Sequence, residues 1–253
     1  MYRHAALDRL LPGLVHGFSG ALPPGEPIAA AARRLLGPRG AAAPPVLELG
    51  QPHSPHLADL TAAEAPADPP VAEGSWKLKG VDGAHARAAW GPVIAIKTAD
   101  CVPVLAVDPE RGRYAALHAG WRGIAGGILP NLLRAWAEGG SSLEAVRLVL
   151  GPAIQRCCYE VGEDCLAHFA PEHLVGAVAR EGPRPHLDLG AVLRAQAAAH
   201  GLGPHQVAAL PYCTACYREA GAHPFASYRR ERRAGRPGGV RNVSFVGVLV
   251  PGE

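Results

Sequence analysis

The sequence lacks any strong imbalance of charge and any long apolar run. Lys and Arg number 25 against 22 for Asp and Glu, which gives a formal net charge of +3. This excess is too small to indicate nucleic-acid binding. No apolar run reaches the roughly 18–20 residues that are needed to cross a bilayer. We therefore expect neither a nucleic acid nor a membrane as partner.

Signals of secretion are also missing. The first residues, MYRHAALDRLLPGLVHGF, contain no long apolar core and no clear cleavage site of small residues, so we predict no signal peptide. Six cysteines in 253 residues do not make a disulfide scaffold. We expect the protein in the reducing cytoplasm.

The residues that are present favour a large folded core. Hydrophobic residues make up 48% of the chain, enough for one large domain or two small ones. Ala, Gly and Pro are abundant, so composition alone would mark some ordered stretches as disordered. We expect loops or insertions at Gly37–Pro45 and Thr61–Glu73, and we find no internal repeat.

Apolar patterns predict strands and helices that alternate along the chain. The predicted strands are 93–96, 102–107 with an interruption at Pro103, 114–118, 146–150 and 243–250. One predicted helix carries apolar residues from Ile128 to Trp136 and ends at Gly139-Gly140; another spans 189–200, with Asp188 as N-cap. This alternation predicts an α/β fold with no obvious domain break.

Three residues could together bind a metal ion: His53, Cys101 and His118. Cys101 lies between two predicted strands and His118 ends the next one, so pairing of these strands would bring them close. One thiolate and two imidazoles suit zinc, and three protein ligands leave a fourth position for water or substrate. Zinc would lower the pKa of such a water toward neutrality.

Spacing alone does not establish this site. The three residues are dispersed, unlike the C-x-x-C pairs of structural zinc sites. The alternative is a buried cysteine and two histidines whose ring nitrogens are hydrogen-bonded within the core. Residue types alone leave both interpretations open.

A glycine-rich turn follows His118. Gly120 and Gly123 flank Trp121 and Arg122 just before a predicted helix. Free backbone N–H groups at that helix start, together with Arg122, would favour an anion such as phosphate. The alternative is a tight strand-to-helix turn with a surface arginine, because short glycine turns are common.

Two further motifs are less specific. The arginine-rich segment 227–236 is typical of a solvated surface or a nucleic-acid patch, although one or two arginines could bind phosphate in bidentate fashion. Cys213-Thr214-Ala215-Cys216 is a lone C-x-x-C motif. Cys157, Cys158 and Cys165 do not give it the spacing of a zinc ribbon, so we interpret it as structural or incidental.

Taken in order, these motifs resemble the YfiH-like family. The matching segments are TADCVPVLAVDP, YAALHAGWRGIAGGIL, GPAIQRCCYEVG, CT and SYRRERRAGR. The resemblance covers residues 46–250, and the paired segments TADC and HAGWRG are specific. Members of the family are labelled polyphenol oxidoreductases, laccase-domain proteins, purine nucleoside phosphorylases or peptidoglycan-editing factors.

The resemblance implies a fold and an activity. The implied fold is a single domain over residues 1–253, a four-layer αββα sandwich with mixed sheets. The implied reactions are phosphorolysis of adenosine, inosine and methylthioadenosine, and deamination of adenosine.

The resemblance also implies site residues. The implied zinc ligands are His53, Cys101 and His118. These ligands and Asp100 are the implied catalytic residues. The implied substrate- or phosphate-binding residues are Gln51, Arg122, Ser227, Arg229 and Arg236.

The N-terminal region departs from the family pattern. His16-Gly17-Phe18-Ser19 is followed by Gly20-Ala21-Leu22-Pro23-Pro24 where the family often has an arginine and a Gly-Gly-Ser run. An Asn-x-x-Arg-like segment is reduced to residues 30–34, and the interval between His53 and Cys101 is long. These departures leave the N-terminal substrate contacts open but do not touch the metal ligands.

The sequence lacks the copper ligands that the laccase label requires. A multicopper oxidase needs many histidine ligands, often in His-x-His pairs, and a blue copper site of two histidines and a cysteine with a weak axial ligand such as methionine. No two of the 12 histidines are two residues apart, and the only methionine is Met1. We therefore expect no four-copper oxidase chemistry, although copper could occupy the zinc ligands adventitiously.

Three functions follow from these residues. Our main hypothesis is a zinc-dependent purine nucleoside enzyme, monomer or homodimer, in which Asp100 carries protons and Arg122 holds phosphate. The first alternative is an amide hydrolase with Cys101 as nucleophile and His118 as base, which edits peptidoglycan precursors. The second is a metal-stabilised binding protein, although a structural site would be closed by four protein ligands and only three good candidates are found.

Overall fold

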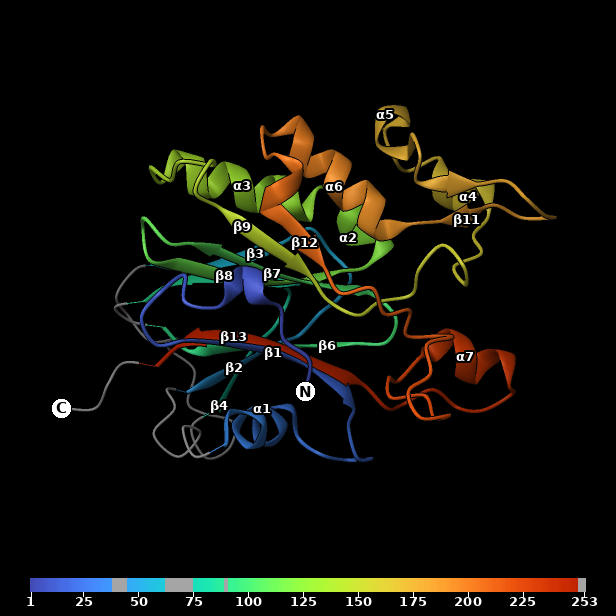
Figure 1. Ribbon diagram of the computed structural model, residues 1–253, viewed down its shortest axis with the longest axis horizontal. Helices are drawn as coiled ribbons and strands as arrows, with labels where there is room; N and C mark the ends of the chain where they lie inside the picture. Colours follow the sequence, from blue (N-terminus) through green and yellow to red (C-terminus); the bar gives the residue numbers. More distant parts are fainter. Residues whose placement is uncertain (38–44, 62–74, 89–90, 250–253) are drawn as a thin grey trace.

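Two facing β-sheets form the centre of the computed structural model, which describes residues 1–37, 45–61, 75–88 and 91–249 (Figure 1). The first sheet has the strand order β1 (Leu14–Ala21), β13 (Asn242–Val248), β6 (Val93–Thr98), β2 (Val46–Leu49), β4 (Ser75–Leu78). The second has the order β12 (Val207–Ala209), β9 (Arg147–Leu150), β7 (Val102–Asp108), β8 (Arg113–Ala119), β5 (Gly83–Arg87), β3 (Leu57–Leu60). Both sheets are mixed: β2 runs parallel to β4 and β6, and β7 antiparallel to β8 and β9.

Helices cover the outer faces of both sheets. Above the second sheet lie α2 (Trp121–Ala125), α3 (Ile128–Glu138) and α6 (Leu189–Ala199), and α1 (Ile28–Leu36) lies below the first (Figure 1). The smaller elements are α4 (Glu163–Leu166), α5 (Pro171–Leu174), α7 (Tyr228–Arg233), the hairpin of β10 (Val178–Ala179) and β11 (His186–Leu187), and 3₁₀ turns at Ala5–Leu7 and Pro204–Gln206. The predicted α/β class and αββα layer order are confirmed.

The central strands are buried on both faces, which explains their continuous apolar runs. In β7, Val104 packs toward the helices, whereas Leu105 packs between the two sheets. In β6, Ile94 likewise faces the space between the sheets, and Ala95 faces α1. This alternation follows from the two-residue period of a strand.

Strand β7 runs without a break through Pro103, so the predicted interruption is wrong. Pro103 is the second residue of the strand and pairs with His118. A proline near the start of a strand removes a donor only where the ladder begins. The predicted cap of α6 is confirmed, because the Asp188 carboxylate accepts from the Ala191 N–H at 2.9 Å.

Some expectations lie outside the described residues. Of the two expected loops, the structure describes only Gly37, Pro45 and Thr61. The expectation of a single domain stays a prediction. Within the described ranges, no helix has the length and apolar character to cross a membrane.

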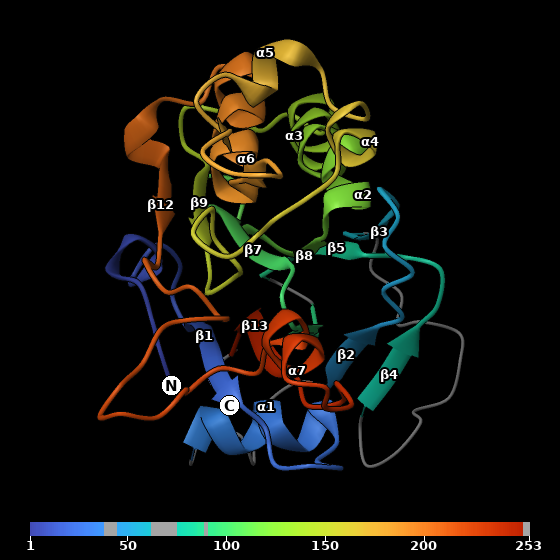
Figure 2. The same ribbon diagram turned by 90° about the vertical axis from the view of Figure 1, so that its right-hand side faces the viewer.

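One end of the sandwich gathers segments that are distant in sequence. The end of β6, the start of β7, the helix α2 and the helix α7 lie at the right of Figure 1, the side that faces the viewer in Figure 2. These segments carry most of the TADC, HAGWRG and arginine-rich motifs singled out in the sequence.

Candidate metal centre

Pairing of β7 with β8 places Cys101 beside His118. Val102 pairs with Ala119 and Pro103 pairs with His118. Cys101 therefore precedes β7 at the point where β8 ends. The two side chains meet because of strand register, as the sequence pattern predicted.

His53 comes from the loop between β2 and β3. Gln51 and His53 have φ angles of 59° and 66°, a left-handed conformation that non-glycine residues keep only where their surroundings hold it. The Gln51 side chain donates to the Lys97 carbonyl at 2.7 Å and accepts from the Lys97 N–H at 3.0 Å. These two hydrogen bonds attach the loop to β6 and hold His53 near Cys101.

The ligand atoms of His53, Cys101 and His118 all lie within 4.8 Å of one another. The two imidazole rings meet edge to face, with centroids 4.8 Å apart and planes at 76°. A Cβ at Gly120 would lie 3.0 Å from the Cys101 Sγ and 3.1 Å from the His53 Cδ2. Any side chain at position 120 would therefore press on the sulfur and the ring, because the backbone approaches them so closely.

Asp82, which the sequence analysis did not single out, supports two of the three candidate ligands. Its carboxylate is fully buried. Oδ1 lies 2.8 Å from the His118 Nδ1 and accepts from the His53 N–H at 3.0 Å. Oδ2 accepts from the N–H and hydroxyl of Ser54.

This carboxylate decides how His118 can act. A carboxylate at Nδ1 keeps a proton there, so that Nε2 is the ring nitrogen that can bind a metal ion once its own proton is released. In the sequence, Asp82 stands in Val-Asp-Gly, a pattern typical of a turn. Only the fold shows that its side chain is directed at a histidine far along the chain.

The charges of Cys101, the two histidines and Asp82 together shift the pKa values of Cys101 and His118. Burial raises the pKa of the Cys101 thiol, but hydrogen bonds from His118 and His53 and their positive charge outweigh burial and bring it to about 6. Burial lowers the pKa of His118, but its hydrogen bonds to Asp82 and Cys101 raise it to about 9. Near neutral pH, Cys101 is therefore a thiolate, the form that binds metals and acts as a nucleophile.

The donor set fits a metal ion. One thiolate and two imidazoles are ligands that zinc and copper accept, and a carboxylate behind a histidine ligand is common in zinc sites. Three protein ligands leave a fourth coordination position open. The structure therefore contains a candidate metal-binding group in which water or substrate can complete the coordination.

The glycine-rich turn packs against the loop that carries His53. A Cβ at Gly123 would lie 3.0 Å from the Ser54 carbonyl oxygen. Of the turn residues, only Gly120 precedes α2, which begins at Trp121 without a side-chain cap, so the expectation that Trp121, Arg122 and Gly123 lie before the helix is wrong. Arg122 is exposed, and its guanidinium carbon lies 4.3 Å from the centroid of the Trp121 ring.

The carboxylate of Asp100 is held by two other segments. Its Oδ1 accepts from the Thr214 hydroxyl at 2.7 Å, and its Oδ2 accepts from the Arg229 N–H at 2.8 Å. The C-x-x-C motif and α7 are thus both attached to the residue that precedes Cys101.

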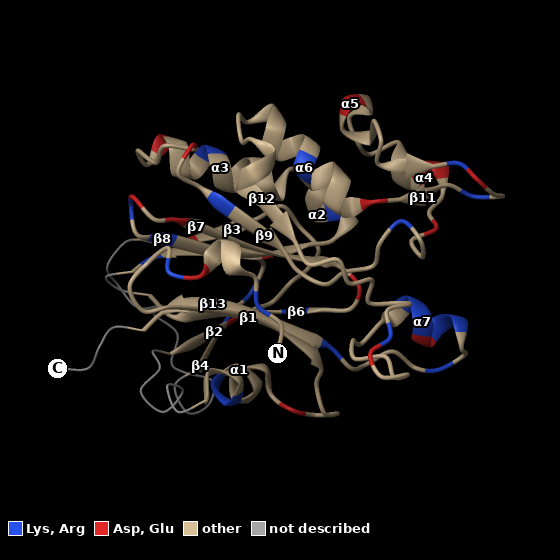
Figure 3. Ribbon diagram, in the orientation of Figure 1, with Lys and Arg blue, Asp and Glu red and all other residues tan. Residues whose placement is uncertain are grey.

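The arginine-rich segment forms α7, the blue helix at the right of Figure 3. Ser227 is its N-cap and accepts from the Arg230 N–H at 3.1 Å. The bond from Arg229 to Asp100 brings the start of α7 to the candidate metal centre. The Arg236 side chain instead pairs with Glu231 at 2.6 Å on the exposed surface.

The fold and the site together define a mixed α/β protein with an open His/Cys/His candidate metal centre. The family model described as multi-copper polyphenol oxidoreductase laccase matches residues 25–243. The chain belongs to this family, which confirms the predicted family membership.

Relatives of known structure or name agree with this. The crystal structure of the Bacillus licheniformis protein YfiH superposes with a TM-score of 0.75 at 25% identity, covering 93% of this chain and 92% of that one. A purine nucleoside phosphorylase of Streptomyces coelicolor is 39% identical over 185 residues, 73% of this chain and 70% of that protein. Adenosine deaminase RL5, from an unknown prokaryotic organism, is 33% identical over 143 residues, 55% of this chain and 54% of that protein.

Proposed function

We propose that the protein is a zinc-dependent purine nucleoside enzyme. Its reactions are phosphorolysis of adenosine, inosine and methylthioadenosine to the base and ribose or methylthioribose 1-phosphate, and deamination of adenosine to inosine. The convergence of His53, Cys101 and His118 within 4.8 Å carries the proposal. The names of the relatives, purine nucleoside phosphorylase and adenosine deaminase, support the substrate class.

His53, Cys101 and His118 would hold the zinc ion. When bound, zinc supplies Lewis-acid chemistry: it polarises a substrate atom and lowers the pKa of a water molecule. Asp82 holds His118 in the tautomer that presents Nε2, and Gln51 anchors the loop of His53. Both act as positioning residues. Copper binds the same ligand types, so metal analysis of the purified protein should measure both elements.

Phosphorolysis requires a phosphate oxygen to attack the anomeric carbon of the ribose while the base leaves. Arg122 is the proposed phosphate-binding residue because it is exposed and follows by two residues Gly120, whose backbone approaches the Cys101 sulfur. Its planar guanidinium, held against Trp121, can donate two parallel hydrogen bonds to phosphate. The remaining proposed substrate-binding residues are Ser227, Arg229 and Arg236.

Deamination requires protons to reach the leaving amine. Asp100 is the predicted proton carrier, but Thr214 and Arg229 occupy its two carboxylate oxygens. Proton transfer would require Asp100 to release one of these partners. We therefore propose that Asp100 mainly positions α7 and the Thr214 turn next to Cys101.

The variant Arg122→Ala tests the proposal by separating the two reactions. Adenosine with phosphate should yield adenine and ribose 1-phosphate, and adenosine without phosphate should yield inosine. Because only phosphorolysis uses phosphate, Arg122→Ala should raise the KM for phosphate about 10- to 100-fold, the scale of a lost charged hydrogen bond. Deamination should keep its rate.

The matched control is Arg134→Ala, an arginine on α3 whose partner is Asn131 in the same helix. This variant should leave both reactions unchanged. No turnover of any purine nucleoside by metal-loaded protein would refute the proposal. Metal binding without turnover of any substrate class would favour the metal-stabilised binding protein.

The amide hydrolase remains as a second candidate because Cys101, His118 and Asp82 are arranged as nucleophile, base and orienting carboxylate. The lowered pKa of Cys101 and the 2.8 Å contact between His118 and Asp82 are what such a triad needs. The proposed substrate is a peptidoglycan precursor from which a misincorporated residue is removed by amide cleavage.

Chelation distinguishes the two candidates. Removal of the metal should abolish nucleoside turnover, and added zinc should restore it. A cysteine hydrolase should instead keep or gain activity on an amide substrate when the metal is removed, and iodoacetamide should then inactivate it. The same preparation therefore decides between a metal centre and a catalytic triad.

We also propose that the enzyme works in the cytoplasm as a monomer or homodimer on small-molecule substrates. The near-balanced charge is consistent with partners other than nucleic acid. Light scattering on the purified protein would measure its oligomeric state.

A further inference from the structure

The fold assembles a second cluster of metal-binding side chains, which we name the four-cysteine cluster: Cys157, Cys158, Cys213 and Cys216. Their sulfur atoms all lie within 4.8 Å of one another, and those of Cys157 and Cys216 are 3.6 Å apart. No second pair of cysteines has the spacing of a zinc ribbon, which is why the C-x-x-C motif by itself indicates only a structural or incidental role. The second pair is Cys157-Cys158, and it comes from a different loop.

Strand order explains why the two pairs meet. β9 and β12 are parallel neighbours, with Leu150 opposite Ala209, so the segments that follow them leave the sheet at the same edge. Beyond the strands, Ala153 pairs with Cys213, and the Thr214 N–H donates to the Ala153 carbonyl at 3.0 Å. This short extension of the parallel pairing carries the two cysteine segments to one place.

We propose that Cys157, Cys158, Cys213 and Cys216 bind one zinc ion in a closed site of four thiolates. Zinc–sulfur bonds of about 2.3 Å in a tetrahedron place sulfur atoms about 3.8 Å apart. The 3.6 Å separation of Cys157 and Cys216 is close to that value, and the 4.8 Å limit on all pairs leaves only small side-chain shifts. A disulfide would use only two sulfur atoms, whereas four sulfur atoms meet here, which favours a metal site.

The backbone around Cys213 prepares its sulfur as a ligand. Burial raises the pKa of Cys213, but N–H groups of Gln155, Cys216 and Ala215 donate to its sulfur and lower the pKa below the ordinary value. N–H groups of the same C-x-x-C turn thus stabilise the thiolate. Burial and the neighbouring thiols raise the pKa of Cys158. A divalent cation would relieve this crowding, because it favours all four thiolates.

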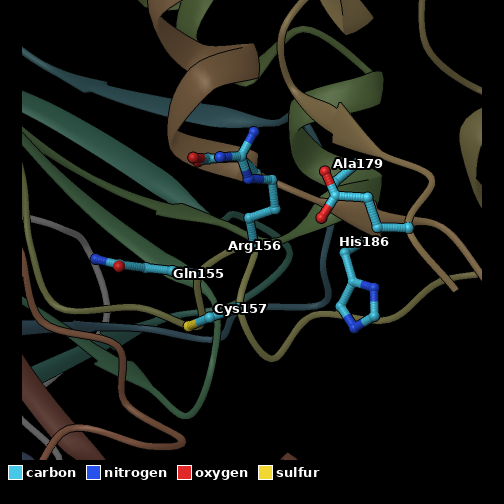
Figure 4. Close-up of a pocket in the computed structure, with 7 residues that line it drawn as sticks. Gln155, Arg156, Cys157, Ala179 and His186 are labelled. Carbon is cyan, nitrogen blue, oxygen red and sulfur yellow. The ribbon is translucent and has the colours of Figure 1, made fainter.

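Metal can reach the site from solvent. Cys157 and Cys216 are exposed, and Cys157 borders a cavity of about 460 Å³. Figure 4 shows Gln155, Arg156 and Cys157 on one side of this cavity and His186 on the other. Exposed ligands and an entry path are what a site loaded after folding requires.

Zinc in the four-cysteine cluster would stabilise the loops that contact the candidate metal centre. Thr214, inside the C-x-x-C turn, donates to Asp100, and the Ile154 N–H donates to the Asp100 carbonyl at 3.0 Å. Arg230 of α7 donates to the Thr214 carbonyl at 2.8 Å. Zinc in the four-cysteine cluster would therefore join two loops that both contact the residue before Cys101.

Zinc content per chain tests the proposal without any assay of turnover. Full-length Cys213→Ala should lose one zinc ion per chain relative to the unmodified protein. Cys165→Ala is the matched control, since Cys165 is a cysteine outside both clusters, and it should lose none. The proposal would be overturned if Cys213→Ala kept its zinc content while the three remaining thiols of the cluster were still free to react.

Ligand replacement separates metal binding from a general loss of folding. Cys216 is exposed, so Cys216→His can offer an imidazole that zinc accepts. Cys216→His should retain zinc, whereas Cys216→Ala should lose it. Full zinc content in Cys216→Ala, with a folded circular dichroism spectrum, would overturn the assignment of this residue as a ligand.

Cobalt gives a readout that needs no substitution in the four-cysteine cluster. In Cys101→Ala protein, added Co²⁺ should produce a strong sulfur-to-cobalt absorption band that saturates at one ion per chain. Failure of the reduced protein to bind Co²⁺, or an intact mass that shows a stable Cys157–Cys216 disulfide resistant to reduction, would overturn the proposal. These outcomes do not depend on which reaction the enzyme catalyses.

Discussion

The two sulfur-containing clusters lie at the same end of the molecule but differ in composition and support. The candidate metal centre combines one cysteine with two histidines and is backed by the buried carboxylate of Asp82. The four-cysteine cluster contains sulfur alone, and backbone N–H groups donate to the sulfur of its Cys213. Thr214 and Asp100 connect the two through one hydrogen bond.

This difference indicates a division of roles. Three mixed ligands leave a coordination position for substrate, whereas four sulfur ligands fill the coordination shell and leave no position for water or substrate. A carboxylate behind a histidine sets which ring nitrogen reacts, which matters for chemistry, and N–H groups behind a thiolate only hold it in place. We therefore infer that one cluster reacts and that the other holds the loops around it.

The largest expected effect is that of Cys101→Ala. This variant should lose zinc from the candidate metal centre, and nucleoside turnover should fall by more than the roughly 100-fold that loss of a supporting residue costs. Cys165→Ala, the control, should keep full activity. Turnover and zinc content are the two measurements, and full activity of Cys101→Ala would exclude the metal mechanism and the triad together.

The pH dependence of alkylation compares the two clusters directly. In metal-free protein, the Cys101 pKa of about 6 means that its reaction with iodoacetamide falls as pH drops through 6 and stays high above it. Cys158, whose pKa is raised to about 12, stays protonated at neutral pH. We expect Cys101 to react at least about 100-fold faster at pH 7. Site-resolved mass spectrometry measures both rates. Equal rates would contradict the lowered pKa of Cys101 and the raised pKa of Cys158.

Asp82→Asn removes charge but keeps the shape of the side chain. Without the carboxylate, the pKa of His118 should fall and that of Cys101 should rise, because the imidazolium that stabilises the thiolate is lost. Zinc affinity should drop about 10- to 100-fold. Asp59→Asn is the control, since Asp59 lies 3.6 Å from His85 and is 62% exposed. A competitive chelator titration gives the affinities, and similar values for both variants would remove Asp82 from the site.

Gly120→Ala tests how tightly the candidate metal centre is packed. The added methyl group would press on Cys101 and His53, and we expect a loss of about 1–3 kcal/mol in the free energy of unfolding, together with weaker zinc binding. Gly239→Ala is the control because no atom lies within 4 Å of a Cβ there. Denaturant titration compares the two variants. Equal free energies of unfolding would show that Cys101 and His53 can move aside to make room for the methyl group.

The smallest expected effect is that of Thr214→Val, which removes one of the hydrogen bonds that connect the clusters. It leaves one oxygen of Asp100 without its donor, and we expect a cost of about 1–2 kcal/mol in the free energy of unfolding. Zinc content should not change at either cluster. Loss of zinc from this variant would show that the two sites bind cooperatively.

The regular elements could be predicted because their signals are local. The runs at Val93–Ile96 and Val102–Val107 and the apolar spacing from Ile128 to Trp136 each reflect burial within a single strand or helix. The chemistry of cysteine and histidine likewise suggested a metal without any structure. Pro103 shows the limit, because its position within the ladder, and not its presence, decided that β7 continues.

The sequence alone determined which elements form and which side chains can bind a metal, since periodicity and ligand chemistry are properties of single segments. Only the tertiary structure decided which of these side chains meet. Asp82 reaches His118, and Cys157 reaches Cys216, through strand neighbours and loop crossings that no short window of sequence contains. Contacts between distant segments depend on sheet order and register, and these are set by the packing of the whole chain.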